Sequence, residues 1–277
     1  MNIKLRVLTV FLVAFATLAP VCVLSGGDTK TRNESVELSD GALVEVIAEN
    51  AEIQLKRVTG STLQLSATLN NEEYVDFHTQ KLTEEPVDHF IITATTSTGG
   101  AVTANSLIVI GIPDGIEIII QTTNGALVAD AINVSSADLA TTDGKINLTN
   151  SSGDFDLNTT NSEITVQAVN GNINATTTNA HVWFEGVIAS GNNSISTSNG
   201  DVAVRLRNGS DLVVTGSTHN GDVTINGSGN QEGLVKDGDS TTLDYQIAAG
   251  AGSLNITNGP GAIHINPDTI AVFDGDS

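Results

Sequence analysis

Apolar and polar residues alternate in short runs through the middle of the chain, and the runs recur every nine residues. Units begin at Gly144, Gly153, Ser162, Gly171 and Ala180, and each continues with apolar residues at alternate positions. Successive side chains of a strand point to opposite faces, so this period of two predicts half-buried β-strands. The predicted inward positions are Ile146, Leu148, Phe155, Leu157, Ile164, Val166, Ile173, Ala175, Val182 and Phe184.

A second repeat is about twice as long and marks corners. Asn and Gly adopt the left-handed backbone conformation at little steric cost, so a recurring motif that ends in them predicts tight turns. A constant interval favours a flattened parallel β-solenoid of about 18–20 residues per coil, in which each coil stacks on the last. An antiparallel sandwich or meander is the alternative, because Asn-Gly also closes hairpins. The motif Thr-Thr-Asn-Gly, or a variant of it, stands at 122–125, 141–144, 159–162, 177–180, 197–200 and 218–221.

The pattern is less regular toward both ends of the predicted solenoid domain, which we place at residues 35–273. The segment 70–90 holds several acids and Pro86, and we expect it to be an insertion or a cap. The segment 227–240 is polar and glycine-rich, and we expect a loop there. The runs 254–256 and 263–265 are expected to close the stack, since a proline follows at 267.

The first 27 residues read as a signal peptide or an N-terminal membrane anchor. Lys4 and Arg6 precede an uncharged, largely apolar stretch at 7–24, and small residues follow it. We therefore expect an extracytoplasmic protein of the periplasm, cell envelope or secreted fraction. Cys22, the only cysteine, lies in this segment, where lipidation is an alternative. No disulfide is expected in the remaining chain, so packing and hydrogen bonds must stabilise it.

The strand repeats resemble a known family. An apolar strand that ends at Pro113 is followed by units such as Gly200-Asp-Val-Ala-Val204 and Gly221-Asp-Val-Thr-Ile225. This arrangement is similar to the putative adhesin family of β-strand-repeat domains of bacterial envelope proteins, over roughly residues 40 to 265. Ser162 and Ala180 depart from the family's Gly. The resemblance implies a single-stranded right-handed parallel β-helix and an extracytoplasmic location, and it supplies no catalytic residues.

The charge of the chain limits its partners. The sequence holds 32 acidic and 11 basic residues, for a net charge of -21. Binding to phosphate backbones depends on Lys and Arg, so we expect no nucleic acid partner. An anionic membrane surface is disfavoured for the same reason, and we expect membrane contact only through the N-terminal segment.

Motifs for catalysis or metal binding are weak. The five histidines have no metal-ligand spacing, and the nonapeptides lack the repeated Asp of a calcium β-roll. No Gly-x-Ser-x-Gly elbow is present. Asp154 and Asp156 would share the outward side of one strand, as catalytic carboxylates do on some β-helices, but the acids are spread along the whole chain. We expect no catalytic residues, no metal and no cofactor.

Trp183, the only tryptophan, is the most informative single residue. Its neighbours Val182 and Phe184 are predicted inward, so Trp183 should point outward beside His181. An exposed ring there could stack on a sugar, which makes Trp183 and His181 candidates for ligand contact. Alternatively, the irregular stretch 186–193 covers the ring.

These observations favour a non-catalytic exported β-solenoid that presents a polar face for adhesion or for protein or glycan interaction. The expected partner is an unknown protein or glycan of the cell envelope or surface. Two alternatives remain open: a carbohydrate-active enzyme on the same scaffold, and an envelope sensory or scaffold module. A clustered acidic cleft with raised carboxylate pKa values would favour the enzyme.

Overall fold

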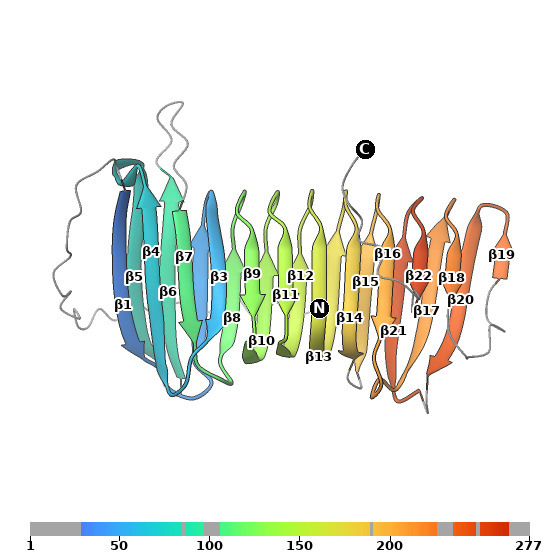
Figure 1. The fold of residues 1–277 in the computed structure, drawn as a ribbon, viewed down its shortest axis with the longest axis horizontal. Helices are drawn as coiled ribbons and strands as arrows, with labels where there is room; N and C mark the ends of the chain where they lie inside the picture. Colours follow the sequence, from blue (N-terminus) through green and yellow to red (C-terminus); the bar gives the residue numbers. More distant parts are fainter. Residues whose placement is uncertain are drawn as a thin grey trace.

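The strands of the protein lie side by side along one long axis (Figure 1). The computed structural model describes residues 29–84, 87–96, 106–188, 191–225, 235–247 and 250–265. The fold is all-β: within these ranges the one helical element is the 3-10 turn η1, Glu72–Tyr74. The predictions made for residues 1–27, Cys22 and Pro267 lie outside the described residues.

In chain order, the strands of the first half are β1 Thr29–Glu37, β2 Leu43–Ala48, β3 Ala51–Arg57, β4 Thr62–Asn70, β5 Val75–Glu84, β6 Val87–Thr96, β7 Ser106–Ile112, β8 Glu117–Gln121, β9 Leu127–Asp130, β10 Asn133–Ala140 and β11 Ile146–Thr149. The second half holds β12 Ser152–Asn158, β13 Ile164–Thr177, β14 Val182–Ile188, β15 Asn192–Thr197, β16 Val202–Leu206, β17 Leu212–His219, β18 Val223–Ile225, β19 Val235–Asp237, β20 Ser240–Ile247, β21 Gly252–Asn258 and β22 Ile263–Ile265.

The middle of the molecule consists of coils with two strands each, and every strand pairs in parallel with strands of the neighbouring coils. Ser136 of β10, for example, lies between Glu117 of β8 and Asp154 of β12. Asn174 of β13 lies beside Ser194 of β15. Partners in these ladders are 18 to 20 residues apart along the chain, as the repeat predicts.

Two stacks of strands result, and we name them by their members. Face A runs β5-β6-β2-β8-β10-β12-β13-β15-β21-β17-β20-β19, and face B runs β1-β4-β7-β3-β9-β11-β13-β14-β16-β22-β18; the long β13 takes part in both. The core lies between them. All of the predicted inward positions from Ile146 to Phe184 are buried, at 2% exposure or less. The register predicted from alternation is therefore confirmed.

The corners between strands tie each coil to the next through a buried threonine. The Oγ1 atom of this threonine donates a hydrogen bond to a backbone carbonyl in the coil before it, which satisfies a buried polar group of each coil. The pairs are Thr141 to Gly125 at 3.2 Å, Thr159 to Gly144 at 3.1 Å, Thr177 to Ser162 at 3.0 Å and Thr197 to Ala180 at 2.7 Å.

The sheet is mixed rather than parallel throughout, which corrects the expectation of one parallel stack. At one end β1 pairs antiparallel with β4, β4 with β7, and β5 with β6. At the other end β20 pairs antiparallel with β17 and β19. The predicted cap at 70–90 therefore lies where expected: η1 and β5 form part of the first antiparallel end.

The coils also depart from chain order near both ends, as the colours of Figure 1 show. The coil β2–β3 lies between β6–β7 and β8–β9. The coil β21–β22 lies between β15–β16 and β17–β18. The runs 254–256 and 263–265 were expected to close the stack, and this was wrong, because they lie inside it.

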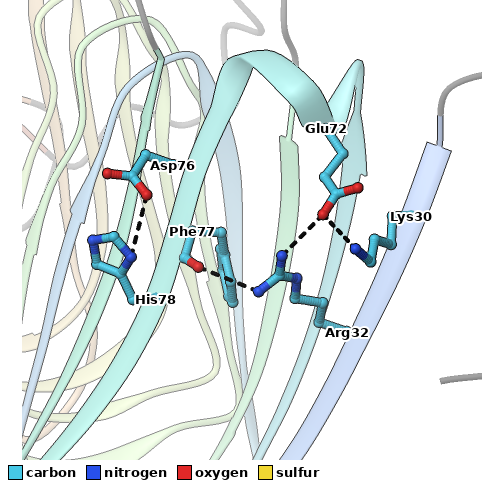
Figure 2. Close-up of polar contacts among 6 residues, drawn as sticks. All are labelled: Lys30, Arg32, Glu72, Asp76, Phe77 and His78. Atoms are coloured by element: carbon cyan, nitrogen blue, oxygen red, sulfur yellow. Dashed lines mark hydrogen bonds and ion pairs between the residues drawn. The ribbon is translucent and has the colours of Figure 1, made fainter. Parts of the chain in front are cut away.

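Charged side chains of β1 and η1 close the N-terminal end of the stack (Figure 2). Arg32 lies over the ring of Phe77, 5.5 Å from its centroid, and its Nη2 donates to Oε1 of Glu72 at 2.9 Å. Lys30 donates to the same oxygen at 2.5 Å. Hydrogen bonds from Lys30 and Arg32 hold the pKa of Glu72 below its usual range. Inward-pointing charges on an edge strand oppose pairing with another chain.

Candidate functional site

A β-bulge in β10 distorts face A. Asn133 pairs with Ser152, but Ser136 pairs with Asp154, so β10 carries one extra residue against β12. Bulges bend a strand and often lie beside functional sites, because they re-aim side chains. The outward residues C-terminal to this bulge line a hollow on the described surface.

This hollow is a groove of about 390 Å³ across the outer surface of β8, β10, β12, β13 and β15, and we call it the face A groove. Parallel ladders align the side chains of its walls in columns. Its lining consists of Glu117, Ile118, Ile119, Ser136, Ala137, Asp138, Asp154, Phe155, Asp156, Asn172, Asn174 and Asn192. Outward carboxylates and amides thus dominate the groove.

Hydrogen bonds within the ladders fix several of these groups. The amide of Asn172 donates to Oδ1 of Asp154 at 2.8 Å, and the amide of Asn158 donates to Oδ1 of Asp156 at 2.6 Å. Ser194 donates to Oδ1 of Asn174 at 2.8 Å. These side chains are therefore held in place before any ligand arrives, which lowers the ordering cost of binding.

Like Glu117, and unlike Asp154 and Asp156, Asp138 has no described side chain that orients its carboxylate. It lies between Ile119 and Asp156 in the ladders, and no described side chain donates a hydrogen bond to it. Partial burial, and then the charge of Asp156, raise the pKa of Asp138 above its usual range. An uncompensated carboxylate in a groove is a recognised sign of a functional site.

Asp138→Asn is expected to stabilise the protein slightly at pH 7. The folded-state pKa of Asp138 is raised, so the charged carboxylate disfavours the folded state. The loss of stability begins as the pH rises through the unfolded pKa, about 3.9, and grows until the carboxyl group is ionised in the folded protein. Removing the charge should raise the melting temperature by about 1 to 2 °C. The gain should vanish below about pH 4. Asp154→Asn is the control, since Asp154 already has a donor. A lower melting temperature for Asp138→Asn at pH 7 would contradict this assignment.

Trp183 and His181, the ligand contacts predicted from the sequence, lie on face B and not in the groove. Trp183 points away from the core, between Thr165 and Ala203, yet it is only 7% exposed. Its ring is therefore covered in this structure. His181 is half-buried, and its Nδ1 accepts a hydrogen bond from the backbone N–H of Asp201 at 2.8 Å. Ligand contact at these two residues stays a prediction.

Sequence reasoning noticed Asp154 and Asp156 but missed their neighbours Glu117 and Asp138. The signal was available, because positions 138 and 156 are one coil of 18 residues apart and pair directly. Glu117 enters the groove one coil earlier, beside Ser136. The acidic residues are spread along the sequence, but the coil period places Glu117, Asp138 and Asp156 on neighbouring strands of one face.

Other chemistry has little support in the described part of the chain. No cluster of three or more His, Cys, Asp or Glu side chains there is arranged to hold a metal ion. Within the same residues, no helix has the length and apolar character needed to cross a membrane.

Comparison with known proteins bears on the family. No curated protein matches this sequence. A putative cell adhesion protein from Clostridium sporogenes is similar in structure, with 15% identity, a TM-score of 0.45, and coverage of 85% of this chain and 99% of that chain. A putative adhesin from Parabacteroides merdae follows with 9% identity, a TM-score of 0.36, and coverage of 86% and 97%. A putative lipid binding protein from Parabacteroides distasonis has 10% identity, a TM-score of 0.33, and coverage of 85% and 96%.

The family itself is identified from the sequence repeats. The sequence model described as Toastrack DUF4097 matches residues 114–266, which is more than half of the chain. This range begins just after the strand that ends at Pro113 and includes all the corners from 122–125 onward. The resemblance drawn from those repeats is confirmed, and the chain belongs to the Toastrack DUF4097 family.

Proposed function

We propose that this protein is a non-catalytic, exported β-solenoid that uses the face A groove for adhesion or for binding a protein or glycan of the cell envelope or surface. In this proposal the parallel coils form a right-handed β-helix across the domain at residues 35–273. Family membership and the signal-like pattern of residues 1–27 support an extracytoplasmic location.

The observation that carries the proposal is the ordered polar lining of the groove. Backbone ladders on neighbouring strands hold the columns of side chains in place, and Asn172 and Asn158 orient two carboxylates. Such an array offers both donors and acceptors to a ligand rich in hydroxyl or amide groups. The only aromatic residue in the lining is Phe155, which is buried, so a sugar would be held by hydrogen bonds rather than by stacking.

Binding by the full-length protein can be tested on a glycan array and by pull-down from envelope extracts. The triple variant Asp138→Asn, Asp154→Asn, Asp156→Asn removes three charges from the groove and keeps the side-chain shapes. We expect it to lose about tenfold or more in affinity. The matched control removes three charges from face B: Glu52→Gln, Asp130→Asn and Glu163→Gln. Equal binding by the two triple variants would overturn the proposal.

A carbohydrate-active enzyme is the second candidate, and the raised pKa of Asp138 favours it specifically. Glycoside hydrolysis uses a protonated carboxylic acid together with a second carboxylate, and Asp156 lies directly beside Asp138 in the ladder. Incubation with polysaccharides and measurement of new reducing ends tests this candidate. If the wild-type protein forms new reducing ends and Asp138→Asn does not, the protein is an enzyme. If the wild-type protein forms none, the enzyme is excluded and the binding function remains.

A further inference from the structure

The last coil of the chain occupies an unexpected position. Strands β21 and β22 follow β17 and β18 in sequence, yet they lie between β17–β18 and β15–β16. Consecutive elements usually lie side by side, and the central coils of this protein obey that rule. The position of β21–β22 therefore departs from this rule.

At the N-terminal end the coil β2–β3 also lies out of chain order, and the order of the strands along the chain explains its position. There the coil in the middle, β2–β3, comes first in the chain, so β6–β7 and β8–β9 can add to its two sides in turn. At the C-terminal end the coil in the middle comes last. Five residues separate β16 from β17, whereas 45 separate β16 from β21, so loop closure in the folding chain favours contact of β17–β18 with β15–β16 first.

Without β21–β22, the coil β17–β18 fits directly on β15–β16. Val202 and Val223 both pair with Ile263, and Ile195 and Gly216 both pair with Ile256. Removing the shared partner would bring each pair together without a change of register. The resulting interval of 21 residues is close to the 20 that separate Asn174 from Ser194.

The corner motifs favour the same direct contact. Thr-Ser-Asn-Gly at 197–200 and Thr-His-Asn-Gly at 218–221 continue the repeat, whereas the inserted coil has Asn-Gly-Pro-Gly at 258–261. Asn258 thus takes the place of the buried threonine. It is 5% exposed, and no described group donates a hydrogen bond to its Oδ1. A buried acceptor without a partner is costly, so the inserted corner fits less well than the others.

We propose that β17–β18 first stacks directly on β15–β16, and that β21–β22 then inserts between them. The inserted state is the final one because it buries four further core residues, Leu254, Ile256, Ile263 and Ile265, each with no exposed surface. The protein therefore passes through a state that is one coil shorter, and the terminal coil is the movable element of the stack.

Cysteine pairs in the full-length protein, with Cys22 replaced by Ser, can distinguish the two states during refolding. Ser196 and Ser217 both pair with Thr257 on the outer side of face A, so they are two strand spacings apart, about 9.6 Å, which is too far for a disulfide. The pair Ser196→Cys and Thr257→Cys joins direct neighbours of the inserted state. Asn158→Cys with Ser196→Cys is the matched control, because both residues flank Thr176 where the coils follow chain order.

Oxidation at intervals after refolding begins should link Ser196→Cys to Ser217→Cys early and not after folding is complete. The pair Ser196→Cys and Thr257→Cys should show the reverse order, and the control pair should stay unlinked throughout. If the first pair links no more than the control at every time, the proposal is wrong.

The variant Asn258→Thr provides a second arm. By analogy with Thr197, whose Oγ1 donates to Ala180, a threonine at 258 would donate to the carbonyl of Gly200. The inserted state should then form sooner, so the early link between positions 196 and 217 should disappear faster and the melting temperature should rise. An unchanged decay of that link would show that this corner does not limit insertion, and would overturn the proposed role of Asn258.

Discussion

Phe155→Asp is expected to unfold the protein or to lower its melting temperature by about 10 to 20 °C. Phe155 is 2% exposed and lies between Ala137 and Ile173 of the neighbouring coils, which are also buried. The substitution removes a buried ring, which costs about 3–5 kcal/mol, and places an unpaired carboxylate in the core. Together these losses approach the total stability of about 5–15 kcal/mol that a folded domain has.

The adjacent Asp156→Asn is the matched control for this experiment, measured by thermal unfolding monitored with circular dichroism. Asp156 points outward into the face A groove. The free energy of unfolding of Asp156→Asn should differ from that of the wild-type protein by no more than about 0.5 kcal/mol, because surface substitutions away from structural features usually have effects that small. If Asp156→Asn were the more damaging of the two, the register of β12 would be shifted by one residue.

The sequence was sufficient to predict this register and the corners of the middle coils. Alternation identifies inward positions because the core lies on one side of each strand, and Phe155 and Ile173 are both buried as predicted. The motif Thr-x-Asn-Gly, or a variant such as Thr-x-Asp-Gly, identifies corners because a buried threonine and a close backbone contact are needed there, as at Thr141 and Gly144. Both features depend on local chemistry that recurs in every coil.

The order of the coils and the antiparallel ends could not be predicted in the same way. A strand such as β4 alternates identically whether its partner is parallel or antiparallel, so its pattern carries no information on direction. Likewise, the repeat at 218–221 predicts stacking on 197–200, yet β21–β22 lies between them. That outcome depends on the long-range burial of residues such as Ile263, which a local pattern does not contain.

The candidate site could be predicted from the sequence only in part. The coil period of 18 residues places Asp138 beside Asp156, so this pairing was predictable once the period was known. The bulge that adds a residue to β10 was missed, although the sequence carries a sign of it: two polar residues, Ser135 and Ser136, separate the buried Val134 and Ala137 and interrupt the alternation. A second sign is on the partner strands, where Gly153 and Gly171 stand side by side.

Gly171→Ala is expected to lower the stability of the protein by about 3–5 kcal/mol, or the melting temperature by about 10 °C. Gly171 has φ of 155°, a backbone conformation that residues with a Cβ rarely adopt. A Cβ there would also lie 1.8 Å from the carbonyl oxygen of Gly153. The contact can be relieved only if β13 moves away from β12, which breaks ladder contacts on each side, and the backbone strain would remain.

Gly216→Ala is the matched control, because it is another buried strand glycine of face A. A Cβ at Gly216 would meet Cβ of Leu243 at 3.4 Å, an ordinary contact, and its φ lies outside the left-handed region. This variant should lose no more than about 1 kcal/mol. Because Asn172 follows Gly171 and holds Asp154, Gly171→Ala should also weaken binding in the groove, whereas Gly216→Ala should not. Equal melting temperatures for the two variants would show that β12 and β13 do not approach as closely at Gly153 and Gly171 as the structure has them.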